Sequence, residues 1–174
     1  MTSGHGSGDA ARMPNRSVAI IGSFRQHYDQ VLSAWTDFRS AGWNVTSPKG
    51  TPIVEPGIPF VRFESDYPEW DDGIVQTVAL HRILRADLTY VVAPDGYVGR
   101  TTCYEIGRVI QANRPLYISC QPVDLPLIIP DLHIVSPTVL TARLRTEPEP
   151  LFSSTRTEYA LWERQLIVGR YLQH

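Results

Sequence analysis

The residue of this chain best placed to do chemistry is a glutamate near the start of an expected helix. Glu105 follows a short apolar run, Leu88–Ala93, and the turn residues Pro94-Asp95-Gly96, and it falls one turn into a helix that we expect to begin at Thr102. Free backbone amides and the positive end of the helix dipole surround such a position, and both favour an ionised carboxylate. We therefore expect Glu105 to stay ionised, which suits a nucleophile.

The same residues also have a purely structural interpretation. Thr102 and Glu105 have the spacing of a capping box, in which a hydroxyl at the N-cap and a carboxylate at N3 satisfy each other's backbone amides. This pattern opens many helices, so taken alone it favours capping over catalysis.

A second group of residues suited to ligand binding follows the first apolar run, Ser17–Gly22. Gly22 permits close backbone approach, Ser23 offers a hydroxyl, and Arg25 offers a fixed fork of donors. Together they suit a phosphate or a sugar, whereas the tetrapeptide alone favours a plain strand-to-helix turn with Arg25 on the surface.

Short apolar runs alternate along the chain with segments whose apolar residues have helical spacing. This pattern predicts the strands and helices that position these residues. We expect strands at 17–22, 43–45, 88–93, 116–118 and 132–135, and helices at 27–41, 74–85 and 102–113. This alternation indicates an α/β fold, and the strand-loop-helix-strand unit 86–118 implies a right-handed parallel crossover. We predict a flavodoxin-like (Rossmann-like) three-layer sandwich with strand order 2-1-3-4-5, which would bring residues 22–25 beside 95–105 in one crevice.

The remaining segments carry weaker signals. We expect residues 1–15 to be a flexible tail, 16–174 a single domain, 58–66 a short extended piece, and 157–172 a C-terminal amphipathic helix. The acidic and aromatic segment 66–72 is either a substrate-facing lid or a solvated loop with Trp70 in the core.

Composition excludes several classes of function. The chain has 174 residues, a net charge of -2 and no basic cluster, so nucleic acid is a poor partner, and no apolar run is long enough for a membrane span. Cys103 and Cys120 match no metal-ligand spacing, and His5 alone is not a metal site. Free thiols and the lack of a secretion signal predict a cytoplasmic protein.

Three stretches together resemble the nucleoside 2-deoxyribosyltransferase family and the related nucleotide N-glycosidases. They are Gly22-Ser23-Phe24-Arg25, the segment ADLTYVV at 86–92, and GRTTCYEIG at 99–107. The motif of an Ala-Asp pair, an apolar strand, a loop and then T-x-x-E-I-G is fairly specific, and the likeness covers roughly residues 17–120. The loop at 94–105 is also similar, more weakly, to the P-G-G-x-G-T-x-x-E loop of nucleoside-monophosphate phosphoribohydrolases of the lysine-decarboxylase-like family, although Arg100 interrupts its Gly-Thr pair.

The first resemblance implies a small homo-oligomeric α/β enzyme, without a cofactor, that cleaves the N-glycosidic bond of a nucleoside or its monophosphate. The family nucleophile falls on Glu105, and Asp95 is a candidate for acid/base work or for binding a hydroxyl. The expected substrate-binding residues are Gly22, Ser23, Phe24, Arg25, His81, Tyr97, Gly99 and Thr102.

This chain also departs from the family pattern. A tyrosine common on the family's first strand is Ala19 here, and the helix before Asp87 offers His81 in place of an aspartate. These departures favour the alternative of a non-catalytic nucleotide-sensing module. A scaffold or dimerisation domain, in which Glu105 only caps a helix, is the third possibility.

Overall fold

The computed structural model describes residues 16–49, 67–123 and 125–146. Three of the expected segments therefore lie outside the described residues: the tail 1–15, the extended piece at 58–66, and the helix at 157–172.

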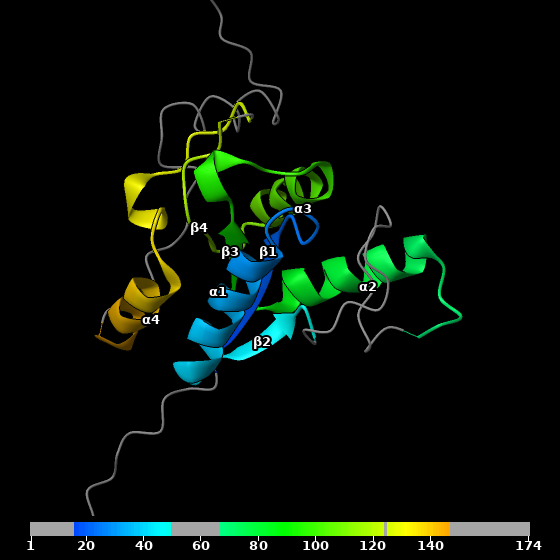
Figure 1. Cartoon of the computed structure of the whole chain (residues 1–174), viewed down its shortest axis with the longest axis horizontal. Coiled ribbons are helices and arrows are strands. Elements are labelled where there is room, and N and C mark those ends of the chain that lie inside the picture. The colour runs from blue at the N-terminus through cyan, green and yellow to red at the C-terminus, as the bar shows by residue number, and fades with distance from the viewer. Residues whose placement is uncertain (1–15, 50–66, 124, 147–174) are drawn as a thin grey trace, which may run out of the picture.

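Among the described residues, four parallel strands form a central sheet (Figure 1). Their order is β2-β1-β3-β4, with bounds Ser17–Gly22 for β1, Asn44–Ser47 for β2, Leu88–Val92 for β3 and Leu116–Ile118 for β4. The predicted parallel α/β arrangement is confirmed, and β1 and β3 are direct neighbours, with Gly22 in register with Val92. Both strands therefore end at the same edge of the sheet.

The expected strand at 132–135 is absent from the described part of the chain. Residues Asp131–His133 form a short 3-10 helix, η2, and Ile134 makes one isolated parallel bridge to Ile118. The next helix, α4 (Pro137–Thr146), begins three residues after Ile134, so the segment between η2 and α4 is too short for a regular strand. The prediction of a fifth strand was wrong at this position for that reason.

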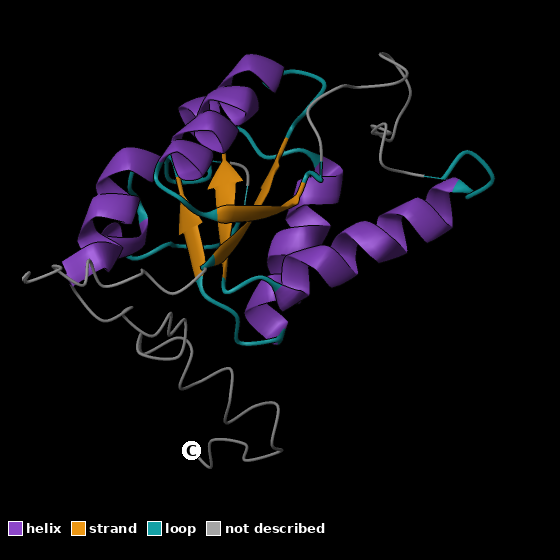
Figure 2. Cartoon of the chain, turned by 90° about the horizontal axis from the view of Figure 1, so that it is seen from below, coloured by secondary structure: helices purple, strands orange, loops and turns teal. Residues whose placement is uncertain are grey.

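Helices cover both faces of the sheet, as Figure 2 shows. α1 (Tyr28–Ser40) and α4 share one hydrophobic cluster with the sheet, while α2 (Asp72–Arg85) and α3 (Arg100–Gln111) contribute to the other. Successive side chains of a strand point to opposite faces of the sheet. In β1, Val18 and Ile20 therefore belong to the first cluster, and Ala19 and Ile21 to the second. Among the described helices, none is long and apolar enough to cross a membrane.

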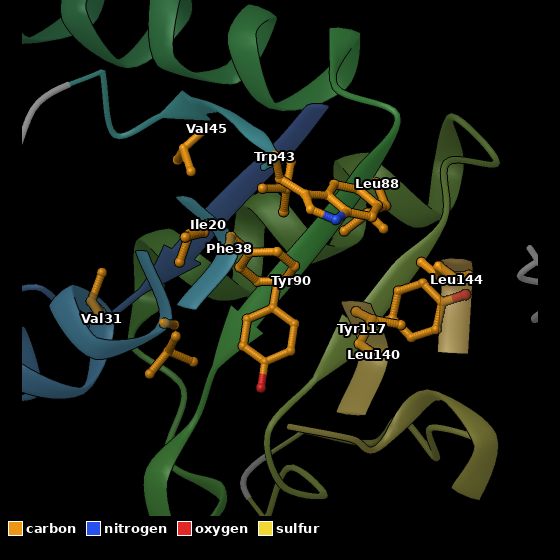
Figure 3. Packing of buried hydrophobic residues seen from close by; sticks show 13 residues of the cluster. Ile20, Val31, Phe38, Trp43, Val45, Leu88, Tyr90, Tyr117, Leu140 and Leu144 are labelled. Carbon is orange, nitrogen blue, oxygen red and sulfur yellow. The ribbon is translucent and has the colours of Figure 1, made fainter. Parts of the chain in front are cut away.

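A cluster of aromatic side chains packs between α1 and the sheet (Figure 3). Phe38 of α1 is fully buried and meets Trp43 and Tyr90 edge-on, at ring-centroid distances of 5.8 and 5.3 Å. The Tyr90 hydroxyl donates a 2.9 Å hydrogen bond to the Val135 carbonyl. These contacts attach α1 and the segment before α4 to β3.

We expect Phe38→Ala to lower the free energy of unfolding by about 3–5 kcal/mol, because it removes a fully buried ring and leaves a cavity between α1 and β3. Gln30→Ala, at an exposed position of the same helix, should change it by less than about 0.5 kcal/mol. Urea denaturation of the variants measures both values. Equal effects of the two substitutions would contradict this account of the core.

Candidate functional site

A cavity of about 650 Å³ opens at the carboxyl end of β1, between α2 and the first turn of α3. Its walls come from the end of β1 and the loop after it, the end of β2, one side of α2, and the segment leading into α3. The described lining residues are Ile20, Ile21, Gly22, Ser23, Phe24, Arg25, Gln26, Ser47, Val75, Gln76, Ala79, Tyr97, Gly99, Arg100, Thr101, Thr102 and Glu105. The ends of parallel strands are where α/β sheets of this kind usually bind ligands.

Most of the residues expected at the site lie on this cavity. The structure brings Gly22–Arg25 together with Tyr97, Gly99, Thr102 and Glu105, because β1 and β3 are adjacent and the segments that follow them leave the same edge of the sheet.

Asp95 and His81 are not brought to the cavity. Asp95 is an exposed residue of the short 3-10 helix η1 (Pro94–Gly96), with φ 54° and ψ 20° in the left-handed region, and it is not among the lining residues. His81 is exposed on α2, about 200° around the helix from Ala79, which does line the cavity. The predicted second carboxylate is thus missing from the described lining.

The capping box predicted at Thr102 and Glu105 is not formed. α3 begins at Arg100, with Gly99 at the N-cap, and among the described residues no side chain makes a capping hydrogen bond to the first amides of the helix. Thr102 is therefore inside the first turn, where it is only 3 % exposed and lines the cavity. The glycine at the start of the helix leaves its amides accessible to a ligand, and it moves Glu105 one turn deeper into the helix than the sequence indicated.

Glu105 is a buried carboxyl group on the cavity wall. It is 8 % exposed, and Gln76 Nε2 donates a 3.4 Å hydrogen bond to its Oε1, the one hydrogen bond recorded for this carboxyl among the described residues. Burial raises the pKa of Glu105 to about 7, and the hydrogen bond from Gln76 opposes that rise. The expectation that Glu105 stays ionised at neutral pH was therefore wrong, because desolvation by burial outweighs the hydrogen bond from Gln76.

Two arginines line the outer part of the cavity. Arg25 follows β1, Arg100 opens α3, and both are exposed. Tyr97 also lines the cavity and is half-buried, and its ring meets that of His27 edge-on at a centroid distance of 5.6 Å. The described lining thus combines a buried acid with two exposed cationic groups and the half-buried rings of Phe24 and Tyr97.

Several lining residues were not predicted from the sequence. Among them, Gln76 and Arg100 have the polar side chains best suited to bind a ligand or another side chain. Arg100 looked like an interruption of a glycine-threonine pair, although it directly precedes the motif. Gln76 had no signal of its own beyond its spacing of three residues from Ala79, which places both on one side of α2.

The described residues contain no group of three or more His, Cys, Asp or Glu side chains that could hold a metal ion. The polar groups of the described lining are instead hydroxyls, side-chain and backbone amides, guanidinium groups and one carboxyl, a set suited to an organic ligand with hydroxyl or anionic groups.

Gly22 lets the backbone of β1 lie close to β3 at the cavity. A Cβ added to Gly22 would lie 2.8 Å from the Val92 carbonyl oxygen, whereas one added to Gly107 in the interior of α3 would meet nothing within 4 Å. We expect Gly22→Ala to lower the free energy of unfolding by about 1–3 kcal/mol. Gly107→Ala should raise it by about 0.5–1 kcal/mol, because alanine favours the helix. Equilibrium unfolding of both variants checks the opposite signs.

The raised pKa of Glu105 makes stability depend on pH. Below about pH 4.5 the folded and unfolded chains both hold the proton, and between about 4.5 and 7 only the folded chain keeps it. This group therefore lowers stability as pH rises through that window, by on the order of 3 kcal/mol in all. Glu105→Gln should remove this loss, so its stability advantage over wild type should be larger at pH 8 than at pH 4.5.

Urea denaturation at the two pH values measures this difference, with Glu69→Gln, at an exposed glutamate, as the control. An advantage of Glu105→Gln that is the same at both pH values would show that the carboxyl is not buried in solution.

No known protein-family model matches this chain, and no curated protein matches its sequence. The family resemblance therefore remains a prediction from the motif residues, and the geometry of the cavity is the independent ground for a functional proposal.

Proposed function

We propose that this protein cleaves the N-glycosidic bond of a nucleoside or a nucleoside monophosphate, with Glu105 as the nucleophile. One observation carries the proposal: a single buried carboxyl lies on the wall of a cavity of about 650 Å³, with a hydrogen bond recorded to only one of its oxygens among the described residues. A sugar ring in the cavity would present its anomeric carbon to the second oxygen.

The chemistry follows from a carboxylate at that place. An oxygen of ionised Glu105 bonds to C1′ while the bond from C1′ to the base nitrogen breaks, and the base takes that electron pair. Water then adds to C1′, the ester bond breaks, and Glu105 is released as a carboxylate with loss of one proton. A second base in place of water gives transfer. Because the described lining holds no second carboxylate, water supplies the proton to the departing base in this scheme.

Other lining residues support binding of such a substrate. Arg25 and Arg100 suit a phosphate or sugar hydroxyls, and the free amides at the start of α3 favour an anion. Phe24 and Tyr97 offer rings for stacking a base. The proposal includes a homo-oligomer and no cofactor, both on the family resemblance.

A nucleotide-sensing module without turnover is the second candidate, and the missing second carboxylate is the observation that favours it. Such a module would bind the same ligands and raise the melting temperature without releasing base.

We expect release of free base from a panel of nucleosides, deoxynucleosides and their monophosphates to rise with pH through about 7, because only ionised Glu105 attacks. Glu105→Gln should lower kcat/KM by at least roughly 10³-fold. Asp131→Asn, which removes an exposed carboxylate of η2, should leave the rate unchanged. Chromatography of the free base measures the rates.

A Glu105→Gln variant with full activity would exclude this nucleophile. Melting shifts with the same ligands but no product would favour the sensing module instead.

A further inference from the structure

Gln76 joins the two helices that enclose the candidate nucleophile. It lies on α2, is half-buried, and lines the cavity together with Glu105 of α3. Its Nε2 donates to Glu105 Oε1 at 3.4 Å, which is long for this kind of bond. Bonds to catalytic groups are often long before a ligand arrives, so this distance is compatible with a functional contact.

The chemistry of a glutamine side chain suits this position. Its NH₂ group is a donor that carries no charge and does not titrate, so it binds a carboxylate oxygen across the whole working pH range. A donor to one oxygen also fixes the rotation of the carboxyl group about its last bond. The second oxygen is then held in one direction.

The other polar groups around Glu105 do not replace Gln76. Arg25, Arg100 and Tyr97 line the same cavity, and no hydrogen bond or ion pair from any of them to Glu105 is recorded. Within the part of the chain that the structure describes, Gln76 therefore makes the one recorded polar contact with this carboxyl.

We propose that Gln76 is a positioning residue, which holds Oε1 of Glu105 and so keeps Oε2 turned to the cavity in the ionised form. The inference rests on the proposed function as far as catalysis is concerned, but the contact and its electrostatic effect are independent of it. The hydrogen bond favours the charged carboxylate, and it lowers the pKa that burial raises. Without the amide, a larger share of Glu105 is protonated at neutral pH.

The first test follows the Glu105 carboxyl directly. The full chain is labelled with ¹³C at glutamate carboxyl carbons, and the Glu105 signal, identified by its loss in Glu105→Gln, is titrated by NMR. We expect a midpoint near pH 7 in the wild type and a higher midpoint in Gln76→Met, which keeps the length of the side chain but lacks the donor. Gln30→Met, at an exposed site on α1, is the matched control and should leave the midpoint unchanged.

A second variant removes the same contact in another way, in case Gln76→Met does not fold. Gln76→Asn stays polar but is one methylene too short to reach Glu105, so it should raise the midpoint as Gln76→Met does. Melting temperatures show whether each variant is folded. An unchanged midpoint in either folded variant would overturn the proposal.

The second test measures catalysis, with release of base from deoxynucleoside monophosphates as the probe. In Gln76→Met the rise of kcat/KM should move to higher pH by the same amount as the NMR midpoint, with activity recovering at pH 9. A merely structural role would leave the midpoint of the pH profile at its wild-type value, and that result would refute the proposal. If the wild type releases no base, the proposed function fails, while the titration still decides the role of Gln76.

Discussion

Burial of one carboxyl group between α2 and α3 is the constraint on which this site depends. An acid removed from water loses much of its tendency to ionise, and the pKa of Glu105 accordingly rises to about 7. Within the described part of the chain, the side-chain amide of Gln76, and not a cation, offsets part of that penalty. Glu105 is thus divided between neutral and ionised forms at physiological pH, and small changes in its surroundings decide which form prevails.

The fold creates this environment through the order of its strands. β1 and β3 are neighbours, so the loop after β1 and the start of α3 meet at one edge of the sheet. Gly22 allows the two strands to lie close together there, with no Cβ against the Val92 carbonyl. α2 packs beside α3 on one face of the sheet, and its residues Gln76 and Ala79 line the cavity together with the loop after β1 and the start of α3.

The charges around the cavity bear on what it can bind. An anionic ligand near Glu105 would favour the protonated acid, since like charges disfavour ionisation. Arg25 and Arg100 provide compensating positive charge towards solvent, and the free amides of the first turn of α3 add to it. In the proposed reaction, these groups would hold a negatively charged substrate while Glu105 remains ionised. An uncharged nucleoside would use the same groups as hydrogen-bond donors to its hydroxyls.

The sequence by itself determined the parallel α/β class and the positions of β1, α1, α2, β3 and β4, because apolar periodicity and turn residues are local signals. It also located Glu105 and the residues Gly22–Arg25, whose types carry chemistry. The tertiary structure decided what local patterns cannot express. It moved the start of α3 to Arg100, left Asp95 and His81 off the cavity, brought in Gln76 from a helix 29 residues away in sequence, and changed the charge state of Glu105. Desolvation and contacts between distant segments exist only once the chain has packed, which is why the protonation of the central acid could not be read from its neighbours in sequence.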